Sequence, residues 1–81
     1  MAETTSASQS LAAEDVAEEL EAIASELRRD DGTVDIAVGN KSVSLNPRDT
    51  MDYDIEVDEH EPMLGDKRES ITIELSWKTD E

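Results

Sequence analysis

The chain has 81 residues and a formal net charge of -15, with 22 acidic residues against 7 basic ones. This length allows one domain, and so few cations disfavour direct binding of a nucleic-acid backbone. Cysteine is absent, which excludes disulfides and thiolate metal sites. No apolar run approaches the ~18 residues of a membrane span, and residues 1–10 do not resemble a signal peptide. We therefore expect a cytoplasmic protein that contacts neither nucleic acid nor membrane.

The large negative charge indicates a protein that works in concentrated salt. Self-repulsion of this size disfavours a compact state in dilute buffer, and low hydrophobicity with high charge is also typical of disorder. The regular apolar spacing described below favours a folded chain instead. Near 1 M salt the Debye length falls to about 3 Å, so diffuse monovalent cations screen most of the repulsion. A salt-loving microbe is the expected source; an acidic protein of a low-salt cell and an acidic decoy are the alternatives.

One amphipathic helix is predicted after a flexible, polar tail at residues 1–10. It runs from about Ala13 to Arg29, because the apolar residues of this stretch fall on one helical face. These residues are Val16, Leu20, Ile23, Ala24 and Leu27. Ser10 is the candidate N-cap, and Gly32 suits the left-handed conformation that follows a helix.

Four runs of alternating apolar and polar residues follow and predict four strands. Gly39-Asn40 fits a type II′ turn between the first two strands. Residues 46–49, with Pro47, form a turn before the third strand, and a long loop from about Glu59 to Lys67 precedes the fourth. The predicted pairs are Val38–Lys41, Ile36–Val43, Val34–Leu45, Val57–Ile71, Ile55–Ile73, Tyr53–Leu75 and Met51–Trp77.

The predicted fold is a single α+β domain over residues 11–81. Its N-terminal amphipathic helix packs on the apolar face of a four-stranded antiparallel meander sheet. One helix is wide enough to cover about two or three strands, so apolar sheet surface remains uncovered near the first or fourth strand. A homodimer is therefore expected.

Two motifs carry a family resemblance: Asp54-Ile55-Glu56-Val57 and Ile73-Glu74-Leu75-Ser76-Trp77. With the acidic amphipathic helix and the hairpin, they resemble the amphi-Trp domain, a family of small proteins frequent in haloarchaea. The resemblance covers about Leu11 to Lys78. The chain departs from the pattern at Ala12-Ala13, where a hydroxyl cap and a basic residue are more usual, and in the long linker around Met63. The resemblance implies the fold and the salt habitat, and no biochemical activity.

No catalytic arrangement is visible in the sequence. His60 stands between Glu59 and Glu61; as a general base it would need an oriented partner and a pocket, and as a metal ligand it would use those carboxylates. A solvated surface histidine is the favoured interpretation. Gly39-Asn40 is too short to cradle a phosphate. We expect no enzyme activity and no cofactor.

Carboxylates alternate along the outer face of the third strand, at Asp52, Asp54, Glu56 and Asp58. Glu74 is predicted to lie opposite Asp54, so Asp54, Glu56 and Glu74 form the alternative Mg²⁺ or Ca²⁺ site. The favoured interpretation is an outer face that holds diffuse K⁺ or Na⁺. The same strand would also mimic a nucleic-acid backbone toward a basic protein.

The fourth strand is the candidate interface, through Ile71, Ile73, Leu75 and Trp77. It has no proline, bulge glycine or inward charge to block edge pairing across a two-fold axis; burial of apolar surface between helices is the other possible dimer. Trp77 is either a core residue at the end of the sheet or a subunit contact. The expected function is a non-enzymatic protein-interaction or adaptor module with an unknown protein partner.

Overall fold

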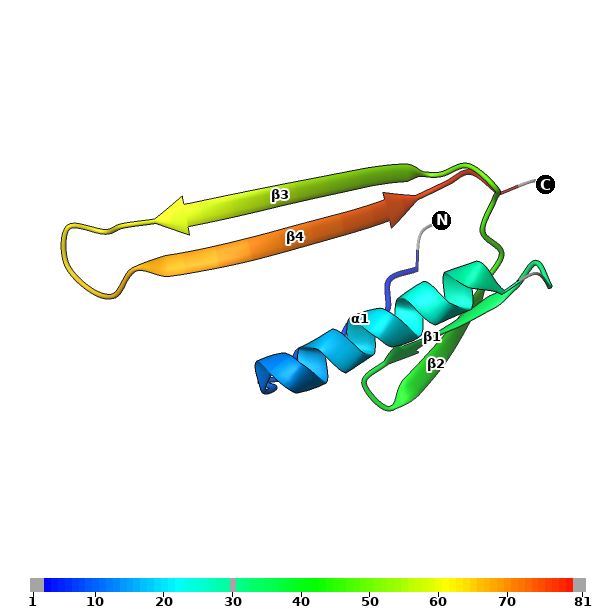
Figure 1. The fold of residues 1–81 in the computed structure, drawn as a ribbon, viewed down its shortest axis with the longest axis horizontal. Helices are drawn as coiled ribbons and strands as arrows, with labels where there is room; N and C mark the ends of the chain where they lie inside the picture. Colours follow the sequence, from blue (N-terminus) through cyan, green and yellow to red (C-terminus); the bar gives the residue numbers. More distant parts are fainter. Residues whose placement is uncertain (1–2, 30, 80–81) are drawn as a thin grey trace. The chain divides into compact units, whose positions relative to one another are not determined.

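A computed structural model describes residues 3–29 and 31–79 and contains one helix and four antiparallel strands (Figure 1). The elements are α1 (Ala13–Arg28), β1 (Val34–Val38), β2 (Lys41–Leu45), β3 (Asp52–His60) and β4 (Arg68–Ser76). The predicted α+β class with an N-terminal helix is confirmed. The chain forms two compact units, Met1–Pro47 and Arg48–Glu81; one domain from residue 11 to 81 stays a prediction.

Helix α1 begins without a side-chain cap. Its N-cap residue is Ala12, whose carbonyl accepts the Asp15 and Val16 amides at 3.0 Å each, so the predicted Ser10 cap is wrong. Acidic side chains in the first turn complement the helix dipole in place of a cap. Arg29 is already extended, with φ -68° and ψ 151°. The helix therefore ends before Gly32, whose positive φ of 79° belongs to the bend that leads into β1.

The first hairpin has the predicted register. Val38 pairs with Lys41, Ile36 with Val43 and Val34 with Leu45. Gly39 has a φ of 63°, and no residue other than glycine has a positive φ in the described part of the chain. A positive φ at the first central position alone fits the predicted type II′ turn. A β-carbon at position 39 would also lie 3.2 Å from the Ala7 β-carbon, so the N-terminal segment approaches the turn closely.

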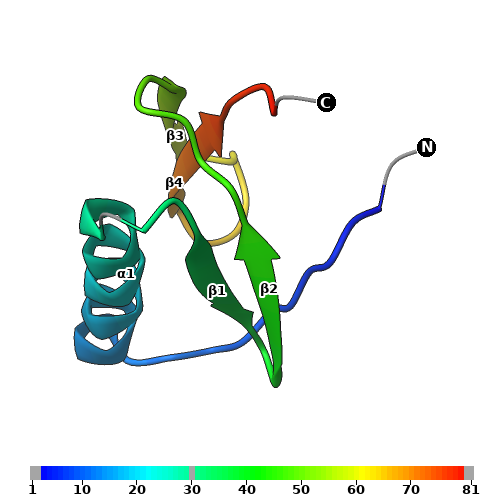
Figure 2. The ribbon, with the colours of Figure 1, turned by 90° about the vertical axis from the view of Figure 1, so that its right-hand side faces the viewer.

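The first unit packs α1 against β1, and Figure 2 shows β1 between α1 and β2. Val34 is 3% exposed and forms the centre of this small core. The apolar residues in the C-terminal half of α1, Ile23, Ala24 and Leu27, are half-buried. Val16 and Leu20 in the N-terminal half are exposed. The predicted apolar stripe is therefore covered over only part of its length.

Glu26 joins α1 to the free edge of β1. Val38 and Lys41 close a two-residue turn and form a hydrogen-bonded pair. Hydrogen-bonded and non-hydrogen-bonded pairs alternate from there along the ladder, so the Asp35–Ser44 pair is non-hydrogen-bonded and the Asp35 amide points away from β2. Glu26 Oε1 accepts that amide at 2.8 Å. The Glu26 carboxylate also binds the Arg29 guanidinium at 3.0 Å. On the other side of Asp35, its carboxylate accepts a hydrogen bond from the Ser44 hydroxyl at 2.5 Å.

Arg29 connects the end of α1 to the bend that follows. Its guanidinium donates to the Asp31 carboxylate at 2.5 Å. This hydrogen bond lowers the pKa of Asp31 below its ordinary value, and the hydrogen bonds to Asp31 and then Glu26 raise the pKa of Arg29. A carboxyl with a lowered folded-state pKa stabilises the fold above its unfolded pKa, and that contribution is lost as the pH falls through the lowered value.

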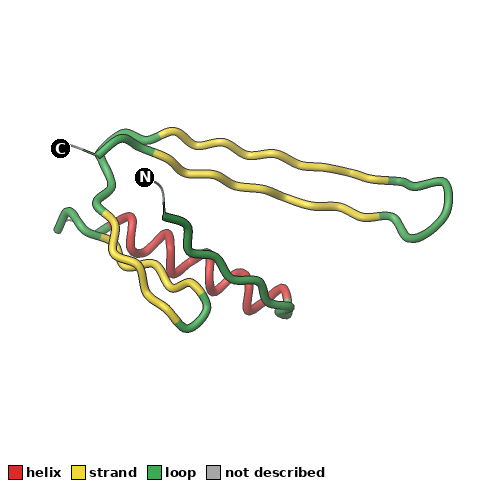
Figure 3. The backbone as a smooth tube through the Cα atoms, turned by 180° about the vertical axis from the view of Figure 1, so that it is seen from behind, coloured by secondary structure: helices red, strands yellow, loops and turns green. Residues whose placement is uncertain are grey.

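The second hairpin consists of two strands of nine residues each, joined by a loop over residues 61–67 (Figure 3). The predicted pairs Val57–Ile71, Ile55–Ile73 and Tyr53–Leu75 are confirmed. The ladder ends at Asp52–Ser76, so Met51 and Trp77 lie beyond it and do not form a strand pair. At the other end β3 continues to His60, and the loop is shorter than predicted. Lys67 Nζ lies 3.5 Å from Glu61 Oε1 across the base of this loop.

The strands form two separate two-stranded sheets, β1–β2 and β3–β4, and not the predicted four-stranded meander. The helix accordingly packs on β1 and not on one continuous sheet. Pro47 follows the end of β2, has no amide to donate to a ladder, and fixes its own φ. Alternation predicts each hairpin correctly but does not determine which hairpin edges join.

Replacing Glu26 with Ala is expected to destabilise the first unit by about 1 kcal/mol, because the Asp35 amide and the Arg29 guanidinium lose their shared acceptor. Urea unfolding of both variants in molar KCl measures the difference. Glu21→Ala is the matched control, since Glu21 is an exposed glutamate of the same helix. Equal unfolding free energies for the two variants would contradict this role of Glu26.

Asp31 is expected to take up its proton at a lower pH than an unpaired aspartate, because the hydrogen bond from Arg29 stabilises the charged carboxylate. Carbon-detected NMR of the carboxyl group measures this titration. In Arg29→Gln the midpoint should rise, and molar KCl should reduce the difference by screening. A midpoint that does not change in Arg29→Gln would show that the pair has no effect in solution.

Candidate interaction surface

One face of the β3–β4 hairpin is an exposed ladder of apolar side chains, which we call the apolar ladder. It consists of Tyr53, Ile55, Val57, Ile71, Ile73 and Leu75. The first five are between 45% and 68% exposed, and Leu75 is half-buried. The sequence positions these residues together, because alternation puts every second side chain on one face and the register sets them opposite each other. Contiguous apolar surface of this kind marks sites of interaction.

The second unit is too small to be stable with this face in water. A two-stranded hairpin by itself is marginally stable at best, and three or more strands or a packed helix are needed. Arg48–Glu81 is also shorter than the ~40 residues below which a chain needs added crosslinks or association. The apolar ladder therefore requires a cover.

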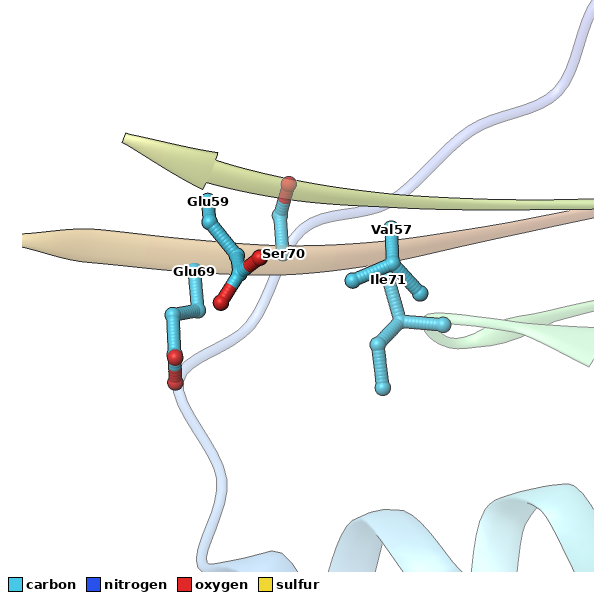
Figure 4. Close-up of a pocket in the computed structure, with 5 residues that line it drawn as sticks. All are labelled: Val57, Glu59, Glu69, Ser70 and Ile71. Carbon is cyan, nitrogen blue, oxygen red and sulfur yellow. The ribbon is translucent and has the colours of Figure 1, made fainter. Parts of the chain in front are cut away.

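Two carboxylates mark the loop end of the apolar ladder. Glu59 and Glu69 pair directly across the strands. In Figure 4 their side chains project to the same side as Val57 and Ile71, whereas Ser70 projects to the other. These residues line an open depression of about 470 Å³. Glu69 is thus an inward charge within β4, and the prediction that β4 carries none is wrong.

The opposite face of β3–β4 is acidic. Asp52, Asp54, Glu56 and Asp58 alternate along β3, and Asp54 lies opposite Glu74, as predicted. Glu56 lies opposite Thr72. Within the described ranges, no group of three or more His, Cys, Asp or Glu side chains is arranged to hold a metal ion. The structure therefore brings Asp54 and Glu74 together but gives the alternative metal site no third ligand.

The remaining candidates lie at the ends of the hairpin. His60 is the last residue of β3, opposite Arg68, and not a loop residue as predicted; its side chain is exposed. Trp77 directly follows β4 and is half-buried. Met63 and Leu64, at the loop, are 101% and 91% exposed and were not predicted as functional residues. The sequence signal for these two residues was their position between Pro62 and Gly65, because a turn does not require large apolar side chains there.

The comparisons with known proteins give one match. The family model of the Amphi-Trp domain matches residues 1–81, the whole chain. No match was found among curated proteins or among solved structures. In the part of the chain that the structure describes, no helix is long and apolar enough to cross a membrane.

Replacing Glu69 with Gln is expected to stabilise the hairpin in dilute buffer by up to about 1 kcal/mol, because like charges directly across a ladder repel. In molar KCl the gain should disappear. Asp58→Asn is the control, since Asp58 lies opposite Ser70 and not opposite a carboxylate. Thermal unfolding at both salt concentrations measures the effect; a gain that persists unchanged in molar KCl would rule out charge repulsion as its cause.

Proposed function

The chain belongs to the Amphi-Trp domain family, and we propose that it acts as a non-enzymatic protein-interaction or adaptor module. The observation that supports this most is the exposed apolar ladder on β3–β4. Full burial of a Val, Leu or Ile side chain contributes roughly 1.5–3 kcal/mol. Side chains that are about half exposed retain a large part of that free energy for association with a partner.

The proposed interface includes the four residues predicted from the sequence: Ile71, Ile73, Leu75 and Trp77. Ile71 and Ile73 are exposed members of the apolar ladder, and Leu75 and Trp77 continue toward its other end, where they are half-buried. The proposed state is a homodimer, because a hairpin of this size needs additional strands or a covering element to be stable.

The proposed setting is the cytoplasm of a halophilic organism. The net charge of -15 on 81 residues opposes both compaction and association in dilute buffer. Monovalent cations at molar concentration screen this repulsion and leave apolar burial as the dominant favourable term. Salt therefore serves as a condition for folding and for association, and no specific ion site is required.

A second candidate function uses the acidic outer face of β3. Asp54 and Glu74 lie directly opposite each other, and such a carboxylate pair attracts a basic protein segment or a divalent cation. Because the whole surface is acidic, this pair is only a small part of the total field. The apolar ladder is the more distinctive surface, so we give it the main role.

Replacing Ile71 with Ser is expected to weaken the capture of protein partners at least tenfold in pull-downs at native salt, because it puts a hydroxyl into the Val57–Ile71 pair of the apolar ladder. Ile71 is 68% exposed, so the substitution should cost the fold little, and NMR of the β3–β4 amides checks this. Glu74→Gln, on the opposite face of the same strand, is the matched control. If Glu74→Gln abolishes capture and Ile71→Ser does not, the outer face is the binding site instead.

A further inference from the structure

Two edges of the β3–β4 sheet are open. Among the described residues β3 pairs only with β4, so each strand has one edge without a strand partner. A nine-residue edge offers a row of backbone amides and carbonyls that pairs readily with another strand. A further pair of strands would also convert a marginal two-stranded sheet into a four-stranded one.

The charges along β3 disfavour pairing of this strand with a second copy of itself. A register that keeps the apolar faces together pairs outer-face residues with outer-face residues. On β3 those residues are Asp52, Asp54, Glu56, Asp58 and His60. Every such antiparallel register places at least one carboxylate opposite another, which is destabilising. The acidic row therefore protects the β3 edge.

The outer face of β4 has a different composition. It carries Arg68, Ser70, Thr72, Glu74 and Ser76, that is, one cation, one anion and three hydroxyl groups. Antiparallel pairing of β4 with β4 of a second copy brings the cation of one strand toward the anion of the other. Pairing of β4 with β3 of a second copy would be heterologous and would continue into an open filament, whereas β4–β4 pairing closes.

We propose that two copies of the chain associate through their β4 edges, antiparallel, with a two-fold axis at Thr72. This inference deepens the proposed interaction role by identifying the first partner as a second copy. In this register all nine residues of β4 pair. The pairs are Arg68–Ser76, Glu69–Leu75, Ser70–Glu74, Ile71–Ile73 and Thr72–Thr72, each between one copy and the other.

The neighbouring registers that also keep the apolar faces together fit less well. With the axis at Ile73, Arg68 lies opposite the partner's Lys78, and like charges repel. With the axis at Ile71, Arg68 lies directly opposite the partner's Glu74, but the last two residues of β4 have no partner in the second β4 strand. The Thr72 axis avoids both problems, and it places Arg68 diagonal to the partner's Glu74, within reach of a long side chain.

The resulting sheet has the strand order β3–β4–β4–β3. The two apolar ladders merge into one surface of double width, on which a further protein partner docks. The acidic β3 strands form both outer edges, and their charges oppose the addition of more strands. Association brings two chains of the same negative charge together and therefore requires salt, and the row of carboxylates makes β3 the less favourable edge for further pairing.

Cysteine cross-linking tests the proposed axis directly, because the chain contains no cysteine of its own. Residues directly opposite each other in an antiparallel pair have α-carbons about 4.5–5.5 Å apart, within the range of a disulfide. In molar KCl under mild oxidation, Thr72→Cys should form a covalent dimer at least tenfold faster than the control Glu56→Cys on β3. Ser70→Cys and Glu74→Cys should cross-link with each other when mixed, and only slowly with themselves.

The inference is overturned if Thr72→Cys cross-links no faster than Glu56→Cys, or if the unmodified chain sediments as an 8.9 kDa monomer in molar KCl. The chain would sediment as a monomer if other residues of the same chain covered the apolar ladder. A dimer in which Ser70→Cys cross-links with itself would exclude the Thr72 axis. If partner capture still depends on Ile71 in a monomeric chain, the proposed function stands and the β4 pairing alone is wrong.

Discussion

Cross-strand packing of apolar side chains on one face of β3–β4 is the constraint on which the rest of the protein depends. The alternation of this hairpin gathers aliphatic residues and Tyr53 on one face and carboxylates on the other. A two-stranded sheet cannot bury such a face by itself. The apolar face therefore needs a cover, whereas the acidic face needs solvent and counter-ions, and these two needs account for the proposed docking of a protein partner and for the proposed salt habitat.

Edge protection differs among the strands, and the differences have separate physical causes. On β1, the Glu26 carboxylate of α1 accepts the outward-pointing Asp35 amide. On β3, a row of acidic side chains makes pairing with a second copy repulsive. The outer face of β4 carries a mixture of charges and hydroxyl groups, so its edge lacks a row of like charges, and its one inward charge, Glu69, lies near the loop end of the strand. The proposed dimer follows from this difference in side chains along the edges, and not from a greater apolar content of β4.

Like-charge pairs within the hairpin show how closely the fold is adapted to screening. Glu59 lies opposite Glu69, and Asp54 lies opposite Glu74. In dilute buffer each pair opposes the ladder that forms it. Because a Debye length of about 3 Å near 1 M salt is shorter than the spacing between such strands, the repulsion becomes small in brine. The acidic surface is then compatible with two nine-residue strands held in register.

The sequence by itself determined the helix, the four strands, the register of both hairpins, the turn at Gly39 and the family, because period and turn chemistry are local properties. Only the tertiary structure decided which edges join. Pro47 ends the first hairpin, and β3 pairs with β4 and not with β2, so two sheets form where alternation alone suggested one. The contact between Glu26 and the Asp35 amide likewise depends on the approach of the helix to the strand, which no local pattern encodes.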